Sequence, residues 1–318
     1  MRRRAGPGLF VAACMLAAVV TTAGGRTQDE RVVEIDTLNV RDVLYHLWGG
    51  GANTVALIDE INGGVVLVDT KRAGWGAALR AAVEQVTDLP VTTIITTTAS
   101  PDHAGGSADF PAVPLIIAHE NTRANLERAG GGNAAGLPTT TFADRYSLLE
   151  DLDRIELYYF GPAHTDGDIV VVFPEKQTAY LGALFPGKAI PAIDRANGGS
   201  GLAFPETLAQ AAAAIDGVTR VIAGHGPRPF TYAGRGPRLD VERRAAGRMS
   251  REDVQEYADF TRDLVAAVEA AFRAGRSAGE TAADLQLPER YADYGRDNAQ
   301  ATVAAIYAEL EQAARTGR

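Results

Sequence analysis

The hydrophobic and polar positions predict a mixed region of strands and helices, followed by a helical C-terminal part. Residues Gly50–Asp59 and Gly64–Thr70 read G-G-A-N-T-V-A-L-I-D and G-V-V-L-V-D-T, which predicts an early β-hairpin. A helical stretch is expected around Trp75–Val86. The β-branched run Pro90–Thr98, P-V-T-T-I-I-T-T-T, predicts a buried strand. The order of these elements favours a mixed α/β domain.

The C-terminal part follows a segment rich in glycine, proline and arginine, Arg228–Arg238, which indicates a linker or surface loop. Apolar residues in Ser250–Ala274 recur close to every 3.6 residues, which predicts an amphipathic helix. Ser250, the first residue of this stretch, is expected to cap the helix start together with Asp253, and Gly275 is expected to end the helix. A second helix is expected over Asn298–Ala314. We expect this extension to pack on the main domain; the alternatives are a substrate lid or a dimer contact.

The first residues combine a charged start, M-R-R-R, with a short apolar core, which predicts a secretory signal over residues 1–25. The sequence T-T-A at Thr21–Ala23 suits a signal peptidase, and the apolar run is too short for a comfortable permanent membrane span. We therefore expect export to the periplasm or the exterior, with no stable membrane span after cleavage. A retained anchor and a lipoprotein box at Val11–Cys14 are the alternatives.

Composition and charge narrow the chemistry further. A chain of 318 residues with 46% hydrophobic and 22% charged residues is typical of a soluble globular domain with an appendage. Cys14 is the only cysteine, so the mature chain would have none, which excludes disulfides, a thiol nucleophile and a thiolate zinc ligand. Loss of Arg2, Arg3 and Arg4 takes the net charge from −9 to −12. Such a surface repels phosphate backbones, so a small-molecule substrate or ligand is expected and nucleic acid is not.

The candidate chemistry centres on Thr98–Gly106, which reads T-A-S-P-D-H-A-G-G. Ser100, Pro101 and Asp102 together predict a helix start, so Asp102 needs no metal to explain it. The chain has five histidines. Besides His103 in this loop, they are His164 in A-H-T-D-G, His225 in G-H-G, and His46 and His119, which are expected to be structural. Two further expectations are that Asp69 supports the loop through hydrogen bonds and that the loop Asn197–Ser200 lies beside the pocket.

This loop resembles the H-x-H-x-D-H motif of the metallo-β-lactamase superfamily, with Thr98 and Ser100 in place of its first two histidines. Further family landmarks follow in order: G-P-A-H-T-D-G-D at Gly161–Asp168, Y-L-G-A-L-F at Tyr180–Phe185 as a strand, and V-I-A-G-H-G-P at Val221–Pro227. The resemblance covers about Val32–Pro229. It implies an αββα sandwich of two mixed sheets over residues 26–235, with the linker and helical extension over 236–318.

The resemblance also implies a ligand set. Of the family's first metal centre only His164 is kept, and one histidine cannot hold zinc tightly. The second centre keeps Asp102, His103 and His225, a complete three-ligand set, whereas Ala183 replaces the aspartate that bridges the two metals. The resemblance therefore implies one zinc ion or none. Asp102 and His164 are the candidate catalytic groups, His164 as a general base, as a group that orients water, or as a further ligand.

Two hypotheses remain at this point. The chain is an exported hydrolase in which one zinc ion activates water against an ester, lactone, amide or thioester; a β-lactam is not singled out. Alternatively, it is a non-catalytic descendant that binds a small molecule or a protein partner in the old pocket, as the changes at Thr98, Ser100 and Ala183 favour. The sequence does not define the oligomeric state.

Overall fold

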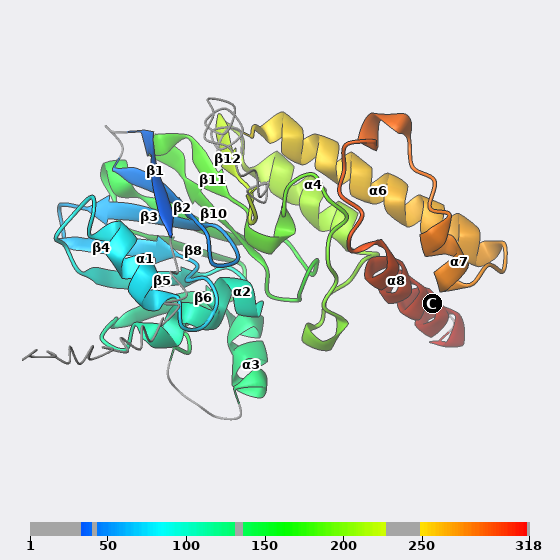
Figure 1. The fold of residues 1–318 in the computed structure, drawn as a ribbon, viewed down its shortest axis with the longest axis horizontal. Helices are drawn as coiled ribbons and strands as arrows, with labels where there is room; N and C mark the ends of the chain where they lie inside the picture. Colours follow the sequence, from blue (N-terminus) through cyan, green and yellow to red (C-terminus); the bar gives the residue numbers. More distant parts are fainter. Residues whose placement is uncertain (1–32, 40–42, 131–135, 227–248, 317–318) are drawn as a thin grey trace, which may run out of the picture. The chain divides into compact units, whose positions relative to one another are not determined.

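The computed structural model describes residues 33–39, 43–130, 136–226 and 249–316 (Figure 1). The expected signal and the expected boundary at residue 235 lie outside the described residues. Two β-sheets form the centre of the unit Arg31–Arg318. None of the helices in the described ranges is both long and apolar enough to cross a membrane.

The first sheet has seven strands in chain order. They are β1 (Glu34–Asn39), β2 (Leu44–Trp48), β3 (Thr54–Asp59), β4 (Gly64–Val68), β5 (Val91–Thr96), β6 (Leu115–His119) and β7 (Thr140–Phe142). Pairing is antiparallel from β1 to β4 and parallel from β4 to β7. This sheet confirms both the predicted hairpin and the predicted β-branched strand.

The second sheet has five strands in the order β12-β11-β10-β9-β8. They are β8 (Arg145–Leu148), β9 (Ile155–Tyr159), β10 (Ile169–Phe173), β11 (Thr178–Tyr180) and β12 (Arg220–Ile222). Only the β11–β12 pair is parallel. The strand expected over Tyr180–Phe185 ends at Tyr180, because Gly182 takes a left-handed φ of 51° and Gly182–Leu184 forms a 3-10 turn.

Alternation along the strands explains the layers. In β4, Val66 and Val68 belong to the core between the two sheets, whereas Val65 and Leu67 face the opposite side and pack with helix α1 (Gly76–Val83). In β10, Val171 faces the core between the sheets and its neighbours face the helices outside. Both faces of each strand are buried, which is why these strands read as continuous hydrophobic runs. The result is the expected four-layer αββα sandwich.

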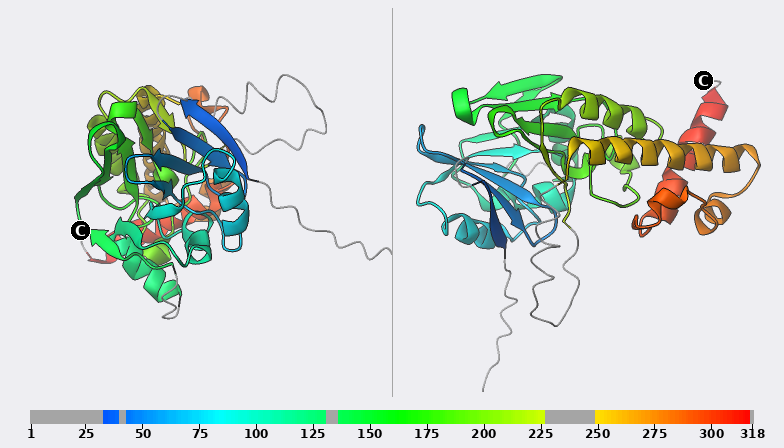
Figure 2. Two further views of the ribbon diagram at one scale, coloured as in Figure 1. Left: turned by 90° about the vertical axis from the view of Figure 1, so that its left-hand side faces the viewer. Right: turned by 90° about the horizontal axis from the view of Figure 1, so that it is seen from above.

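The remaining helices lie outside the sheets. They are α2 (Pro101–Ala104), α3 (Glu120–Ala129), α4 (Phe204–Ala214), α6 (Arg251–Arg273), α7 (Ala278–Ala283) and α8 (Ala299–Thr316). Helix α6 runs alongside α4 (Figure 2), and α4, α6 and α8 share one hydrophobic core with the outer face of the second sheet. Ser250 and Asp253 form the predicted capping box, and Gly275 follows the helix end with a φ of 74°. The C-terminal helices therefore pack on the main domain; α7 was not predicted.

Candidate metal centre

The loop after β5 begins where the sequence places it, but its serine has a different role. Ser100 is the N-cap residue of α2 in extended conformation, and Pro101 is the first helical residue. The Ser100 hydroxyl makes no capping bond; it donates to Oδ1 of Asp102 at 2.7 Å. The helix has only one turn, so its start positions two consecutive side chains, Asp102 and His103, at the end of the strand.

His103 is fully buried and is held by a carboxylate. Its Nδ1 lies 2.6 Å from Oδ2 of Asp69, and since a carboxylate can only accept, Nδ1 carries the hydrogen. Burial acts to lower the pKa of His103, but the charge and hydrogen bond of Asp69 outweigh it and raise the pKa. The other ring nitrogen, Nε2, is buried and has no hydrogen-bond partner among the described residues. That nitrogen is therefore available for a ligand.

Asp69 makes the contacts that the sequence predicts for it. Its side chain accepts hydrogen bonds from the Thr97 backbone (2.8 Å), the Thr97 hydroxyl (2.7 Å) and the Tyr180 hydroxyl (2.9 Å), in addition to His103. Burial raises the pKa of Tyr180 well above its usual value, so this hydroxyl keeps its proton and donates. The expectation that Asp69 supports the loop is confirmed. Tyr180 was missed, although a tyrosine in a buried strand needs a partner for its hydroxyl, which is a usable signal.

The loop after β12 brings His225 to the same place. The side-chain Nδ2 of Asn53 donates to the carbonyl oxygen of Ala223 at 2.8 Å, and the backbone amide of Asn53 donates to the carbonyl oxygen of Gly224 at 2.8 Å. His225 Nε2 lies 2.8 Å from Oδ2 of Asp102. Burial acts to raise the pKa of Asp102, but the hydrogen bond from His225, with the charge of His103, outweighs it and lowers the pKa well below its usual value. Asp102 is therefore ionised.

Three potential ligand atoms converge here. Within the described parts of the chain, one group of three metal-binding side chains has its ligand atoms within 4.8 Å of one another, namely Asp102, His103 and His225. The two imidazole rings meet edge to face, with centroids 5.1 Å apart. One carboxylate and two imidazoles match the donor preferences of a divalent ion such as zinc, and three protein ligands leave a further position free. With the free Nε2 of His103, these residues fit one ion.

The positions of the first centre do not fit a second ion. Thr98 is fully buried, and its hydroxyl lies 3.5 Å from that of Thr165, which donates to Asp168 at 2.6 Å. The Ser100 hydroxyl is hydrogen-bonded to Asp102, and the side chain of Ala183 has no atom that can bind a metal ion. His164 is outside the three-residue group, and its Nδ1 lies 2.9 Å from the carbonyl oxygen of Ala192. The structure thus brings together three of the four predicted site residues.

The two remaining histidines have structural surroundings. His46 is buried in β2 and contacts Trp48 edge to face at 4.9 Å. His119 caps α3 by accepting from the Asn121 amide at 3.2 Å, and its Nε2 donates to the carbonyl oxygen of Ala143 at 2.7 Å. Both predictions of a structural role agree with these contacts. The loop Asn197–Ser200 also lies beside the His164 segment, since the Asp166 amide donates to the Asn197 carbonyl oxygen at 2.9 Å.

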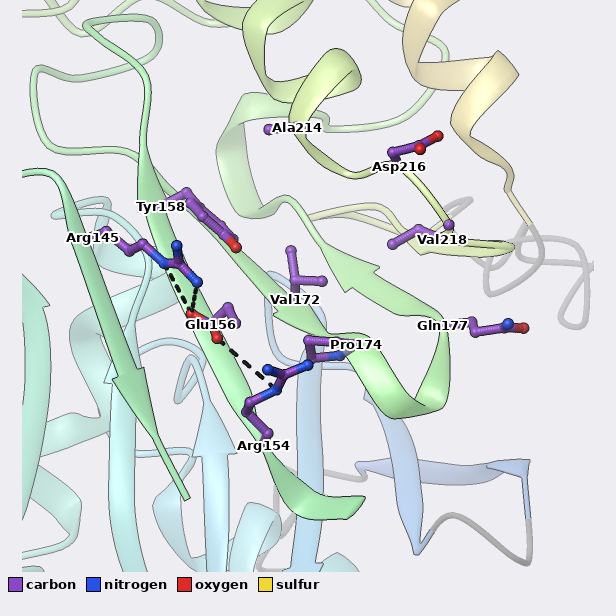
Figure 3. A pocket seen from close by; sticks show the side chains of 11 residues that line it. Arg145, Arg154, Glu156, Tyr158, Val172, Pro174, Gln177, Ala214, Asp216 and Val218 are labelled. Carbon is purple, nitrogen blue, oxygen red and sulfur yellow. Dashed lines mark hydrogen bonds and ion pairs between the residues drawn. The ribbon is translucent and has the colours of Figure 1, made fainter. Parts of the chain in front are cut away.

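A cavity of about 350 Å³ lies elsewhere, on the outer side of the second sheet (Figure 3). Its walls include Arg145 and Arg154, which point toward the nearly buried Glu156. Arg145 donates to Glu156 at 2.9 Å, and Asp216 of the cavity wall pairs with Arg251, so these charged groups already have partners. None of the predicted site residues lines it, and the metal-binding group remains the candidate site.

A sequence profile described as the metallo-beta-lactamase superfamily matches residues 48–225. Three solved structures resemble the fold. DIM-1 metallo-beta-lactamase has a TM-score of 0.52 and 16% identity, covering 68% of this chain and 97% of that one. Metallo-beta-lactamase IND-7 has a TM-score of 0.53 and 20% identity, covering 66% of this chain and 95% of that one. A metallo-beta-lactamase from Pontibacter korlensis has a TM-score of 0.55 and 17% identity, covering 73% of this chain and 99% of that one. At these identities the likeness concerns the fold alone.

A relative in sequence is the alpha subunit of a 2,4-dinitroanisole O-demethylase from Nocardioides sp. (strain JS1661). It is 32% identical over 145 residues, which are 45% of this chain and 44% of that protein. This chain therefore spans less than half of that relative's length.

Proposed function

The chain belongs to the metallo-β-lactamase superfamily, and on that premise we propose that it is a hydrolase that uses one divalent ion, zinc in the first place. Asp102, His103 and His225 would hold the ion. The observation that carries this proposal is the buried, unpartnered Nε2 of His103, whose ring is fixed from the other side by Asp69. An imidazole anchored by a carboxylate on one nitrogen and free on the other is the arrangement that metal ligands commonly show.

A bound divalent ion would supply Lewis acidity, which lowers the pKa of water toward neutrality. The chain's own residues supply the remaining functions. Asp69 fixes the ring of His103, and Ser100 holds one oxygen of Asp102 so that the other faces His225. These contacts orient the ligand atoms before any substrate binds.

His164 would act as the base. The carbonyl oxygen of Ala192 can only accept, so Nδ1 of His164 carries a hydrogen and Nε2 of the neutral ring has a lone pair. Nε2 would take a proton from the attacking water and return it to the leaving alcohol or amine. Ionised Asp102 would stay a ligand and an electrostatic partner throughout.

For the substrate, we propose a small neutral or cationic molecule with an ester, lactone, amide or thioester group. The negative net charge of the chain, −9, supports this preference over nucleic acid. We also propose that the mature protein is exported, on the strength of the charged and apolar N-terminal sequence.

The demethylase relative favours a second candidate reaction, hydrolysis of an aryl methyl ether, in which water adds and a phenol and methanol leave. The matched region is under half of either chain, so the ester-type reaction comes first. A panel that contains a chromogenic phenyl ester, a lactone and 2,4-dinitroanisole separates the two candidates by the product released.

The competing hypothesis is a non-catalytic protein that binds a ligand in the same pocket, favoured by the replaced positions Thr98, Ser100 and Ala183. Elemental analysis and zinc calorimetry on the mature protein, purified without a histidine tag, distinguish the two. We expect about one zinc per chain, lost in His103→Ala and kept in His119→Asn, the control. Asparagine is a good N-cap, so the control preserves α3. No zinc at micromolar concentration, or zinc unchanged in His103→Ala, would reject the proposed function.

A further inference from the structure

A short backbone segment, Ala189–Ala192, connects the C-terminal helices to the candidate site; we call it the strap. Its first three carbonyl oxygens accept hydrogen bonds from side chains of the C-terminal part: Ala189 from Tyr257 (2.9 Å), Ile190 from Asn298 (3.1 Å) and Pro191 from Thr302 (2.5 Å). Thr302 is 1% exposed and Tyr257 is fully buried, so water does not replace the bonds that these two residues make. Three consecutive peptide groups are therefore fixed by residues more than sixty positions away in the sequence.

The fourth carbonyl oxygen of the strap, that of Ala192, bonds His164. It accepts from Nδ1 at 2.9 Å, and the Asp194 amide donates back to the carbonyl oxygen of His164 at 2.8 Å. The ring and the backbone of His164 are thus both tied to this loop. A carbonyl oxygen selects the ring form with hydrogen on Nδ1, so the strap determines which nitrogen has the lone pair.

Helix α8 also holds the far end of the same loop. Glu309 is nearly buried, with a side chain 9% exposed, and accepts from the Ser200 hydroxyl at 2.6 Å and the Gly201 amide at 2.8 Å. The Ser200 amide in turn donates to the carbonyl oxygen of Ala163, the residue before His164. The loop therefore has two separate anchors on the helical extension, one on each side of its contacts with the His164 segment.

We propose that the helical extension is a positioning element of the candidate site: through the strap it fixes the orientation and the tautomer of His164. Thr302 is the central positioning residue, because its hydroxyl holds the peptide next to the one that bonds the ring. The tautomer follows from the hydrogen bonds alone, whereas its consequence for turnover rests on the proposed function.

The test uses the full chain, without metal, with 15N-labelled histidine. Two-bond 15N–1H correlation spectra distinguish the two neutral ring forms, and His164→Gln identifies its signal among the five histidines. Thr302→Val keeps the shape and removes the donor. Thr281→Val is the matched control: this threonine is buried like Thr302, but its hydroxyl bonds residues of the extension, Ser277 at 2.9 Å and Tyr307 at 2.6 Å, instead of the strap.

We expect a single form with hydrogen on Nδ1 in the wild type and in Thr281→Val. Thr302→Val should show a second form with hydrogen on Nε2, and Thr302→Ser should restore the first. An unchanged His164 signal in Thr302→Val, or an equal change in Thr281→Val, overturns the proposal. If Thr302→Val does not fold, Asn298→Ala at an exposed position removes the neighbouring anchor and is read by the same criteria.

Turnover gives a second readout. Once a substrate has been found, Thr302→Val should lower kcat about tenfold with little change in KM. This is a part of the roughly 10²–10⁴-fold rate acceleration that a positioned general base contributes. Zinc affinity should be the same in Thr302→Val and the wild type, because the side chains of Asp102, His103 and His225 are held by Ser100, Asp69 and each other. A protein with the expected tautomer but no turnover would reject the proposed function and leave this inference standing.

Discussion

The burial of Lys71 predicts how the free energy of unfolding depends on pH. Its side chain is fully buried, and Nζ donates to the carbonyl oxygens of Leu47 at 3.0 Å and Ala52 at 2.8 Å. Burial lowers the pKa of Lys71 from 10.5 to about 7 and outweighs the charge of Asp69, which acts in the opposite direction. The two acceptors flank a glycine-rich loop that reaches the site, since the Ala52 amide donates to the carbonyl oxygen of Asp102 at 3.2 Å.

The magnitude is set by the difference between the two pKa values, 10.5 and about 7. At 1.36 kcal/mol per unit, that difference of about 3.5 units corresponds to about 5 kcal/mol. Between these values the unfolded chain holds a proton that the folded chain lacks, so the free energy of unfolding rises with pH across the window. From pH 6 to pH 9 the Lys71 contribution to the free energy of unfolding should rise by about 3 kcal/mol.

The comparison variant is Lys71→Met, which keeps the length of the side chain and does not titrate. It removes the donor of two hydrogen bonds to buried carbonyl oxygens, a loss of about 1–3 kcal/mol each that does not depend on pH. Urea unfolding of both proteins from pH 6 to pH 9 gives the difference in free energy of unfolding, which should be about 3 kcal/mol larger in favour of wild type at the upper end. A flat difference curve would refute the reasoning.

Burial lowers the pKa of His46 from 6.5 to about 4, so wild type should lose up to about 3 kcal/mol relative to His46→Gln as pH falls through this range, as measured by urea unfolding. Asp69→Asn, which also tolerates the left-handed backbone there, should weaken zinc binding about 10–100-fold by calorimetry; unchanged affinity would contradict the proposed support of His103. Gly106→Ala should destabilise the fold because its Cβ would overlap the Thr70 carbonyl group, whereas Gly279→Ala, in open space on α7, should stabilise it by about 0.5–1 kcal/mol in thermal unfolding.

Much of the fold could be predicted because its signals are local. The β-branched strands, the hairpin and the capped helix α6 each occupy one short window of sequence, and their alternation or periodicity states which face is buried. The ligand set Asp102, His103 and His225 could be proposed because the motifs occupy fixed places in a known family, and the structure places their ligand atoms together.

The unpredicted features depend on contacts between distant residues. Lys71 gives no sign of burial in the sequence, since lysine is almost always exposed, and only the closure of the loop around its Nζ makes burial possible. The hydrogen bonds of the strap could not be predicted from the sequence either, because Pro191 and Thr302 are 111 positions apart. The 3-10 turn at Gly182 ends β11 earlier than the pattern suggests, and its cause is a backbone conformation that the pattern does not encode.

The replaced positions bear on whether the remaining site is a relic. The hydroxyl of Thr98 lies 3.5 Å from that of Thr165, and the hydroxyl of Ser100 donates to Asp102 at 2.7 Å, so both replaced side chains have polar partners within the protein. His103, by contrast, keeps a buried nitrogen without a partner in the described chain, an arrangement that costs about 1–3 kcal/mol when nothing binds there. A chain that had abandoned metal could remove this cost by replacing His103 with an apolar residue of similar size. His46 also has a buried Nε2 without a partner in the described chain, so it is the convergence of His103 with Asp102 and His225, within 4.8 Å, that gives the reason to expect that one ion still binds.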